Sequence, residues 1–288
     1  MSNISVPYTG LGRRMRRLLW STRRRLNPDE RVTLPFDNGL KLQVRRKDRL
    51  ARRVYLEGYS DRELAYLVDL VLKPGMIFFD VGAHFGQFTL MASPRVGARG
   101  QVHGFEPTTE TFGQLKANIE LNALENVTIN HNAVYHEKTT LELKVCDSGR
   151  GEFNTLGQPA RRGGGVDHIE KIEAIRLDDY VAEHQIGRVD LMKIDVEGAE
   201  DFVLRGGADL LSREDAPILS IEFSERNVEA MGYGVDVIRT RMQGFGYTLF
   251  SFTPESGILS PFPDDAQHAD GDNVIGVKSR DNWPGTFA

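Results

Sequence analysis

The sequence predicts an α/β fold built on a mostly parallel sheet with helices on both faces. From about residue 76 onward, short apolar segments typical of strands alternate with longer segments typical of helices. Three of the predicted strands end in an acid, namely Asp80, Glu106 and Asp195. Such alternation is typical of parallel sheets, which bind ligands in the crevice at the carboxyl ends of their strands. We therefore expect these acids to lie at a binding site.

A hairpin and a helix are predicted before this series. Asp37-Asn38-Gly39 lies between alternating runs at 31–34 and 40–44, and Asn-Gly in that position is a strong hairpin signal. Ser60 then predicts the N-cap of a helix, with Glu63 three residues later as its capping-box partner.

The alternating series predicts most of the remaining elements. Strands are expected at 76–80, 101–106, 127–131, 189–194 and 217–223, with closing strands at 247–252 and 273–278. Helices are expected at 86–93, 110–122, 199–211 and 235–243.

Residues 139–176 interrupt this alternation. Two strands are predicted there, at 141–145 and 171–176, and the segment between them, 147–165, is rich in glycine. A long loop inside a compact domain is usually functional. We interpret the region as a lid over the substrate, with Asn154 as a polar contact. A simple surface insertion is the alternative.

The turn after the first strand of the series predicts a ligand. In Asp80–Gly86 a strand ends in an acid and leads through a glycine loop into a helix. Gly82 and Gly86 permit close approach to the backbone, amides at the helix start suit a negative group, and Asp80 suits a positive one. A small zwitterion such as S-adenosylmethionine fits. When the dinucleotide fingerprint G-x-G-x-x-G is aligned on Gly82, it requires glycine at positions 80 and 85, where this chain has Asp80 and Phe85. An NAD-dependent oxidoreductase is therefore the weaker alternative.

Two later segments extend this site. Glu106 follows Asp80 by 26 residues, about one βαβ repeat, and an acid there is placed to bind both hydroxyls of a ribose. Farther along, Val189–Glu200 is another apolar strand that ends in acids and leads into a helix.

Together these segments resemble the FkbM family of S-adenosylmethionine-dependent methyltransferases. The resemblance covers about residues 55–225 and rests on FFDVGAHFGQFTL, GQVHGFEP, LKANIELNALENV, VDLMKIDVEGAEDFVLRGG and ILSIEF, in that order. It implies the Rossmann-like class I methyltransferase fold, with a seven-stranded sheet whose last strand is antiparallel. His84 departs from the family pattern, where a smaller residue is more usual, and this bears on the shape of the loop.

The resemblance and the strand-end acids together give an expected site. The cofactor-binding residues are expected to be Asp80, Gly82, Ala83, His84, Gly86, Glu106, Pro107, Asn132, Ala133 and Asp195. Within this set, Asp80 would hold the amino end of the cofactor, directly or through water, and Glu106 the ribose. The resemblance places Asn132 and Ala133 beside the adenine.

The catalytic candidates are carboxylates. We expect Asp195 to be the base or the substrate anchor, followed by Glu222 and Glu197, because a carboxylate within reach of a hydroxyl can accept its proton. The alternative is that these three acids share a divalent cation such as Mg²⁺, although no metal is expected. For Glu197 the alternative is a helix-capping role, which is also the role expected of Glu200. Lys193 is expected to lie on a strand with its charged end in water.

The predicted reaction is S-adenosylmethionine-dependent O-methylation of a hydroxyl on a sugar, glycolipid or natural product. The resemblance favours oxygen, since no residue spacing requires it. The alternative is a protein that binds S-adenosylmethionine without catalysis. Neither the acceptor nor the oligomeric state is predicted.

Composition narrows the class of protein. The chain has 288 residues, 40% hydrophobic and 27% charged, which suits one large globular domain. The lone Cys146 excludes an internal disulfide and a multi-cysteine zinc site, and it agrees with a reducing, cytoplasmic location. No apolar run approaches about 18 residues, so we expect no transmembrane helix.

Charge is distributed unevenly along the chain. Residues 1–53 hold 15 of the 36 Lys and Arg residues and 4 of the 41 Asp and Glu residues, a net charge of +11, so residues 54–288 carry −16. We therefore divide the chain into a basic arm with its hairpin, 1–53, and a methyltransferase domain, 54–288. The acidic domain argues against a nucleic-acid partner. The arginine-rich stretch 11–26 is expected either to be a solvated tail, docked or free, or to contact an anionic membrane surface.

Overall fold

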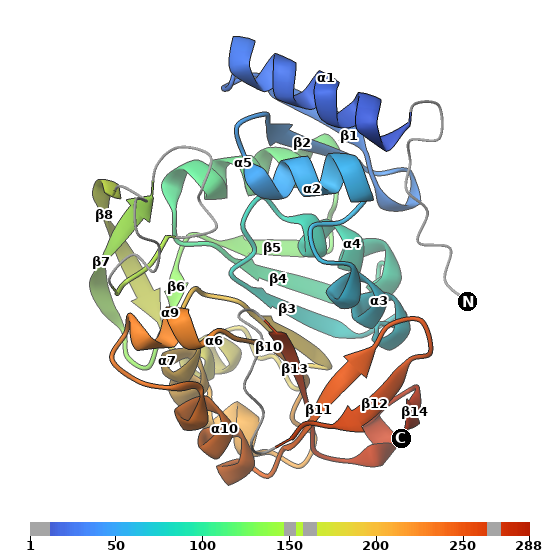
Figure 1. The fold of residues 1–288 in the computed structure, drawn as a ribbon. Coiled ribbons are helices and arrows are strands. Elements are labelled where there is room, and N and C mark those ends of the chain that lie inside the picture. Colours follow the sequence, from blue (N-terminus) through green and yellow to red (C-terminus); the bar gives the residue numbers. More distant parts are fainter. Residues whose placement is uncertain (1–11, 147–153, 158–165, 264–271) are drawn as a thin grey trace.

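A nine-stranded sheet forms the centre of the protein in a computed structural model, which describes residues 12–146, 154–157, 166–263 and 272–288 (Figure 1). Its strand order is β5-β4-β3-β9-β10-β13-β11-β12-β14. The strands are β3 (Ile77–Val81), β4 (Gln101–Phe105), β5 (Val127–Asn130), β9 (Leu191–Ile194), β10 (Ile218–Phe223), β11 (Thr248–Thr253), β12 (Ile258–Pro261), β13 (Asp272–Val277) and β14 (Thr286–Phe287).

The predicted mostly parallel sheet is confirmed. Strands β5, β4, β3, β9 and β10 are parallel, and β13 lies antiparallel between β10 and β11. Two short strands, β12 and β14, extend the expected seven at one edge. The chain leaves β3 in one direction toward β4 and β5, and later returns to the other side of β3 with β9. The junction of β3 and β9 is therefore a topological switch point, where sheets of this kind bind ligands.

Alternate residues of the central strands face opposite layers of helices. Phe78 belongs to one hydrophobic cluster and Phe79 to the other, because successive strand residues point to opposite faces. The first cluster includes residues of α2 (Arg49–Glu57), α3 (Arg62–Val71) and α4 (Gln87–Val96), with α5 (Thr109–Leu121) packed against it. The second includes residues of α6 (Leu177–Glu183), α7 (Glu200–Gly206), α8 (Ala208–Ser212), α9 (Glu225–Glu229) and α10 (Val235–Gly244). Helices thus cover both faces, as predicted.

Two helix boundaries differ from those expected. The N-cap of α3 is Asp61 rather than Ser60, since the Asp61 carboxylate accepts the Leu64 amide at 3.0 Å and also the Asn273 side chain at 2.6 Å. The second contact joins the start of α3 to β13. Asp61 is therefore the N-cap partly because of a residue far away in the sequence. The single helix expected at 199–211 is interrupted at Gly207 and becomes α7 and α8. Helix α2 was not predicted at all.

A small second sheet stands beside the main one. In it, β8 (Val166–Ile175) pairs in parallel with β6 (Ala133–Val134) and antiparallel with β7 (Thr139–Cys146). Asn154 to Gly157 follow its edge through a bridge between Lys144 and Thr155. Most of the expected lid, 147–153 and 158–165, lies outside the described residues.

The N-terminal elements are α1 (Arg13–Leu26), β1 (Arg31–Pro35), the 3-10 turn η1 (Asp37–Gly39) and β2 (Lys41–Arg45); a second 3-10 turn, η3 (Arg280–Asn282), lies near the C-terminus. The predicted hairpin is confirmed: β1 pairs antiparallel with β2, and Asn38 and Gly39 take left-handed backbone conformations with φ of 51° and 79°. Leu42 shares the hydrophobic cluster of Phe78. Among the described residues, no helix is long and apolar enough to cross a membrane.

Candidate active site

A cavity with about 770 Å³ of empty volume lies at the carboxyl ends of β3, β4 and β9. Nine of the expected site residues line it: Gly82, His84, Glu106, Pro107, Asn132, Ala133, Asn154, Asp195 and Glu197. Four do not, namely Asp80, Ala83, Gly86 and Glu222. Segments far apart in the sequence therefore meet at one site, as the strand-end acids predicted.

The glycine loop is held by its own hydrogen bonds. The amides of Gly82 and Ala83 both donate to the Phe105 carbonyl, at 3.0 and 2.9 Å, and the Gly86 amide donates to Ala83. These three amides are thus already paired within the protein. A Cβ on Gly82 would lie 1.9 Å from the Asp195 carbonyl oxygen, so only glycine lets the loop pack against the end of β9.

Glu106 is fixed in place by two backbone amides. Its carboxylate accepts the His84 amide at 2.9 Å and the Thr108 amide at 3.0 Å, and the side chain is almost fully buried. His84 reaches this position with φ of 52°, a conformation uncommon outside glycine. Burial raises the pKa of Glu106, although the hydrogen bonds from the two backbone amides and the nearby His84 side chain oppose this rise. The Thr108 side chain is a third hydrogen-bond partner of this carboxylate.

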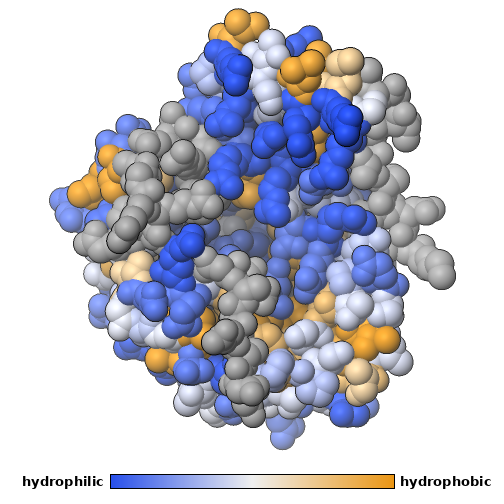
Figure 2. All heavy atoms as spheres, viewed as in Figure 1, coloured by the Kyte–Doolittle hydropathy of each residue, from blue (hydrophilic) through white to orange (hydrophobic). Residues whose placement is uncertain are grey.

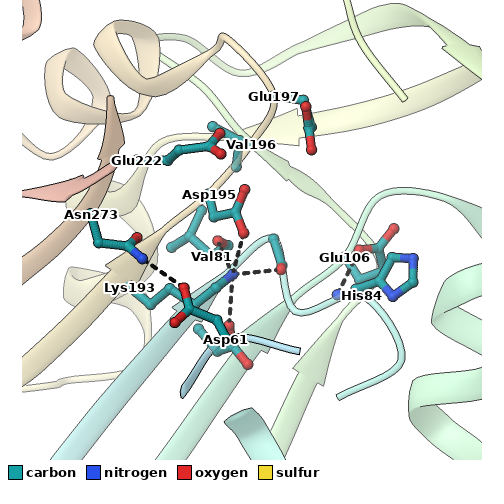
Figure 3. Close-up of polar contacts among 12 residues, drawn as sticks. Asp61, Val81, His84, Glu106, Lys193, Asp195, Val196, Glu197, Glu222 and Asn273 are labelled. Atoms are coloured by element: carbon teal, nitrogen blue, oxygen red, sulfur yellow. Dashed lines mark hydrogen bonds and ion pairs between the residues drawn. The ribbon is translucent and has the colours of Figure 1, made fainter. Parts of the chain in front are cut away.

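Lys193 differs from the expectation that its charged end reaches water. The side chain is only 4% exposed, and its Nζ donates to the Gly82 carbonyl at 2.8 Å (Figure 3). The same nitrogen lies 3.3 Å from Asp80 and 3.7 Å from Asp195. Burial by itself lowers the pKa of Lys193, but the two carboxylates more than offset it and the pKa is raised. Lys193 is therefore a buried cation that joins β3 to β9.

Asp80 is buried beneath the loop rather than placed in the cavity. It is completely inaccessible to solvent, and its carboxylate accepts the Thr89 hydroxyl at 2.6 Å besides pairing with Lys193. A direct contact between Asp80 and a cofactor is not available in this arrangement. Because a buried carboxylate requires compensation, Thr89 and Lys193 are the groups that permit an acid at this strand end.

Three acids meet at the ends of β9 and β10. Asp195, Glu197 and Glu222 each place one carboxylate oxygen within 4.8 Å of the others, and Figure 3 shows them around a shared space. Like charges at this distance repel unless a proton or a cation neutralises them. Burial, followed by the charges of Asp195 and Glu200, raises the pKa of Glu222 well above its ordinary value. A proton on Glu222 can thus relieve the repulsion without a metal.

Neighbouring residues that the sequence did not single out support this cluster. The Asn227 amide donates to Glu197 at 2.9 Å and to Glu222 at 3.4 Å, so it holds the two acids together. The Glu200 carboxylate accepts the amides of Val196 and Gly198, and its burial raises its pKa to about 7. Glu200 thus folds back onto the loop before α7.

The wall opposite the acids is apolar. Val134, Leu143 and Ile172 of the small sheet line the cavity, together with Leu50 of α2. Asn154 is fixed at its rim, accepting the Cys146 amide at 3.0 Å and donating to the Thr108 hydroxyl at 3.2 Å. No local pattern identified Leu50, because only the fold brings α2 to the cavity.

Comparison with known proteins agrees with this architecture. The model of the methyltransferase FkbM domain family matches residues 80–249. The protein named 31-O-demethyl-FK506 methyltransferase FkbM, from Streptomyces tacrolimicus, is 32% identical over 186 residues, which cover 55% of this chain and 69% of that protein. Methyltransferase sdnD from Sordaria araneosa is 29% identical over 182 residues, which cover 54% of this chain and 68% of that protein.

A solved structure of a methyltransferase FkbM from Methylobacillus flagellatus KT has a TM-score of 0.45 and 13% identity, with 79% of this chain and 53% of that chain covered, a score too low to add to the assignment. The family model, in contrast, spans more than half of the chain and contains the glycine loop, Glu106 and the acid cluster. This protein therefore belongs to the FkbM methyltransferase family.

Proposed function

We propose that this protein transfers a methyl group from S-adenosylmethionine to a hydroxyl of a small-molecule or glycan acceptor. The observation that carries the proposal is the single cavity that joins the glycine loop and Glu106 to the acids after β9. The relative from Streptomyces tacrolimicus is named as an O-methyltransferase of a small molecule, which supports an oxygen acceptor.

The lining of the cavity fits the proposed cofactor. Glu106 lines the cavity with its carboxylate fixed by two amides, and an acid at this strand end suits the hydroxyls of a ribose. Val134, Leu143 and Ile172 provide an apolar surface for a flat base, beside Asn132 for a polar edge. When bound, S-adenosylmethionine supplies an activated methyl group on a sulfonium, so the protein mainly has to align the acceptor.

We assign proton removal from the acceptor to the cluster after β9. Asp195 lines the cavity with its side chain 43% exposed, and Lys193 lies 3.7 Å from it on the protein side. This ion pair orients the carboxylate and leaves its other side open to an acceptor hydroxyl. Asp195 then accepts the proton as the methyl group is transferred. Glu222, with its raised pKa, contributes a proton-bearing carboxyl next to it.

A ligand titration tests the proposal. S-adenosylhomocysteine should raise the melting temperature strongly, since it binds only the folded state, whereas NAD should not. Stabilisation by NAD alone would favour the oxidoreductase alternative. Incubation with methyl-labelled cofactor and a panel of glycans and small hydroxylated compounds, followed by mass spectrometry, should show a mass gain on the acceptor. Strong cofactor binding with no labelled product across the panel would favour a non-catalytic binding protein.

A further inference from the structure

Helix α1 (Arg13–Leu26) presents an apolar face to solvent instead of to the protein. Eight large hydrophobic side chains are exposed among the described residues, and four of them belong to this helix. They are Met15, Leu18, Leu19 and Leu26, with 48, 61, 37 and 80% of their surface exposed. Their spacing of i, i+3, i+4 and i+11 places them on one side of an α-helix. Figure 2 shows hydrophobic surface over α1 set among hydrophilic surface.

The side of α1 that packs against the protein consists of a tryptophan and arginines, not of the aliphatic side chains. Trp20 is completely buried, with its ring centre 4.8 Å from that of Tyr55 and the Arg46 guanidinium 5.0 Å away. Arg16 is also buried and donates to the Leu56 carbonyl at 3.2 Å, near the end of α2. Arg13 forms an ion pair with Glu57. These contacts fix the rotation of the helix, so the apolar face is held outward.

This orientation is the reverse of an ordinary surface helix, which buries its apolar face against the core. The exposed leucines therefore need another explanation than packing within the chain. The charge of α1 identifies the chemistry of a partner, since the helix carries seven arginines and no acid, whereas residues 54–288 carry a net charge of −16. At 100° per residue, Arg14 and Arg25 lie on one edge of the apolar face and Arg23 on the other.

We propose that α1 is a docking surface for an anionic lipid bilayer, lying in the membrane interface with its leucines among the acyl chains and its arginines at the headgroups. An apolar stripe bordered by arginines is the pattern of helices that lie in the interface plane. The acidic domain is repelled by the same surface, so the bilayer contacts the α1 end of the molecule (Figure 1). This inference is independent of the reaction that the cavity performs.

Flotation of the full chain with vesicles tests the proposal. The protein should bind vesicles of phosphatidylcholine mixed with phosphatidylglycerol at low salt, bind pure phosphatidylcholine weakly, and be released at high salt. The variant Leu18→Ser/Leu26→Ser should lower the partition coefficient about 100-fold, because two leucines leave the acyl region. Arg14→Gln/Arg25→Gln should lower it about 30-fold.

A matched control uses exposed hydrophobic residues elsewhere. Leu121→Ser/Val237→Ser changes side chains that are 40 and 38% exposed on α5 and α10, and it should bind vesicles as the wild type does. All three variants should keep the wild-type melting temperature. Equal vesicle binding by Leu18→Ser/Leu26→Ser and the wild type would overturn the proposal. So would a wild-type dimer in solution that this variant dissociates, since a second copy would then cover the face.

Discussion

Two groups of acids lie at the strand ends near the cavity, and the fold treats them in opposite ways. At the ends of β3 and β4, each carboxylate has donors of its own: Glu106 accepts two backbone amides, and Asp80 accepts Thr89 and pairs with Lys193. At the ends of β9 and β10, three carboxylates approach within 4.8 Å and two of them share the amide of Asn227. The first group has a fixed geometry, and Glu106, its member that lines the cavity, suits binding. The second group holds excess negative charge and suits proton transfer.

Replacing Asp195 is expected to have the largest effect and tests the second group. Asp195→Ala should lower turnover about 10²–10⁴-fold, the usual contribution of a general base, with little change in S-adenosylhomocysteine affinity. Single-turnover kinetics and calorimetry would measure the two quantities. Asp236→Ala, at a highly exposed position on α10, is the control and should turn over normally. Unchanged turnover in Asp195→Ala would remove this residue from catalysis.

Lys193 links the two groups, and its loss should weaken the whole fold. Lys193→Met leaves Asp80 buried without its cation, which should lower the free energy of unfolding by about 3–5 kcal/mol in urea denaturation. Adding Asp80→Asn should recover part of the loss, since a neutral amide tolerates burial better. Lys116 is exposed, so Lys116→Met is the control and should leave the free energy of unfolding almost unchanged. If Lys193→Met were equally neutral, the buried pair would contribute no net stability.

The dependence of stability on pH tests the burial of Glu200, whose charge acts on Glu222 of the second group. Burial raises the pKa of Glu200 from its ordinary 4.5 to about 7, so the folded state holds a proton that the unfolded state has released. Stability from this residue is therefore complete below pH 4.5 and is lost as the pH rises to about 7, by about 3 kcal/mol. Glu200→Gln should remove that slope from urea denaturation measured across this range. The exposed Glu229→Gln should keep it, and a wild-type slope in Glu200→Gln would contradict the assignment.

Glu106 should show the smallest of these effects, confined to binding. Glu106→Gln exchanges a charged acceptor for a neutral one. It should weaken the binding of S-adenosylhomocysteine by about 1.5 kcal/mol, roughly tenfold in Kd. Calorimetry at a pH well above the ordinary pKa of a glutamate would measure this loss of affinity. The exposed Glu120→Gln on the neighbouring helix should bind normally. A loss of turnover without a loss of affinity in Glu106→Gln would mean that the two groups of acids do not divide binding and chemistry as we propose.

Local sequence was sufficient for most of the elements, although not for α2, and for the polar residues at the strand ends that line the cavity. Strand and helix positions follow from apolar periodicity, and the acids at the ends of β3, β4 and β9 follow from where those runs stop. Boundaries failed where a distant partner decided them. Asp61 replaced Ser60 as the N-cap because it also contacts Asn273, and the helix expected at 199–211 is interrupted at Gly207.

What the sequence determined by itself was the class of fold, the family and the order of acids along the chain, because these depend on periodicity and on short motifs. Only the tertiary structure decided which of those acids reach the cavity. Asp80 and Asp195 both end an apolar run, yet the first is buried against Lys193 and the second is 43% exposed. The same holds for α1, whose periodic leucines would ordinarily predict a buried face. Burial is a property of neighbours supplied by distant segments, and a local pattern does not contain them.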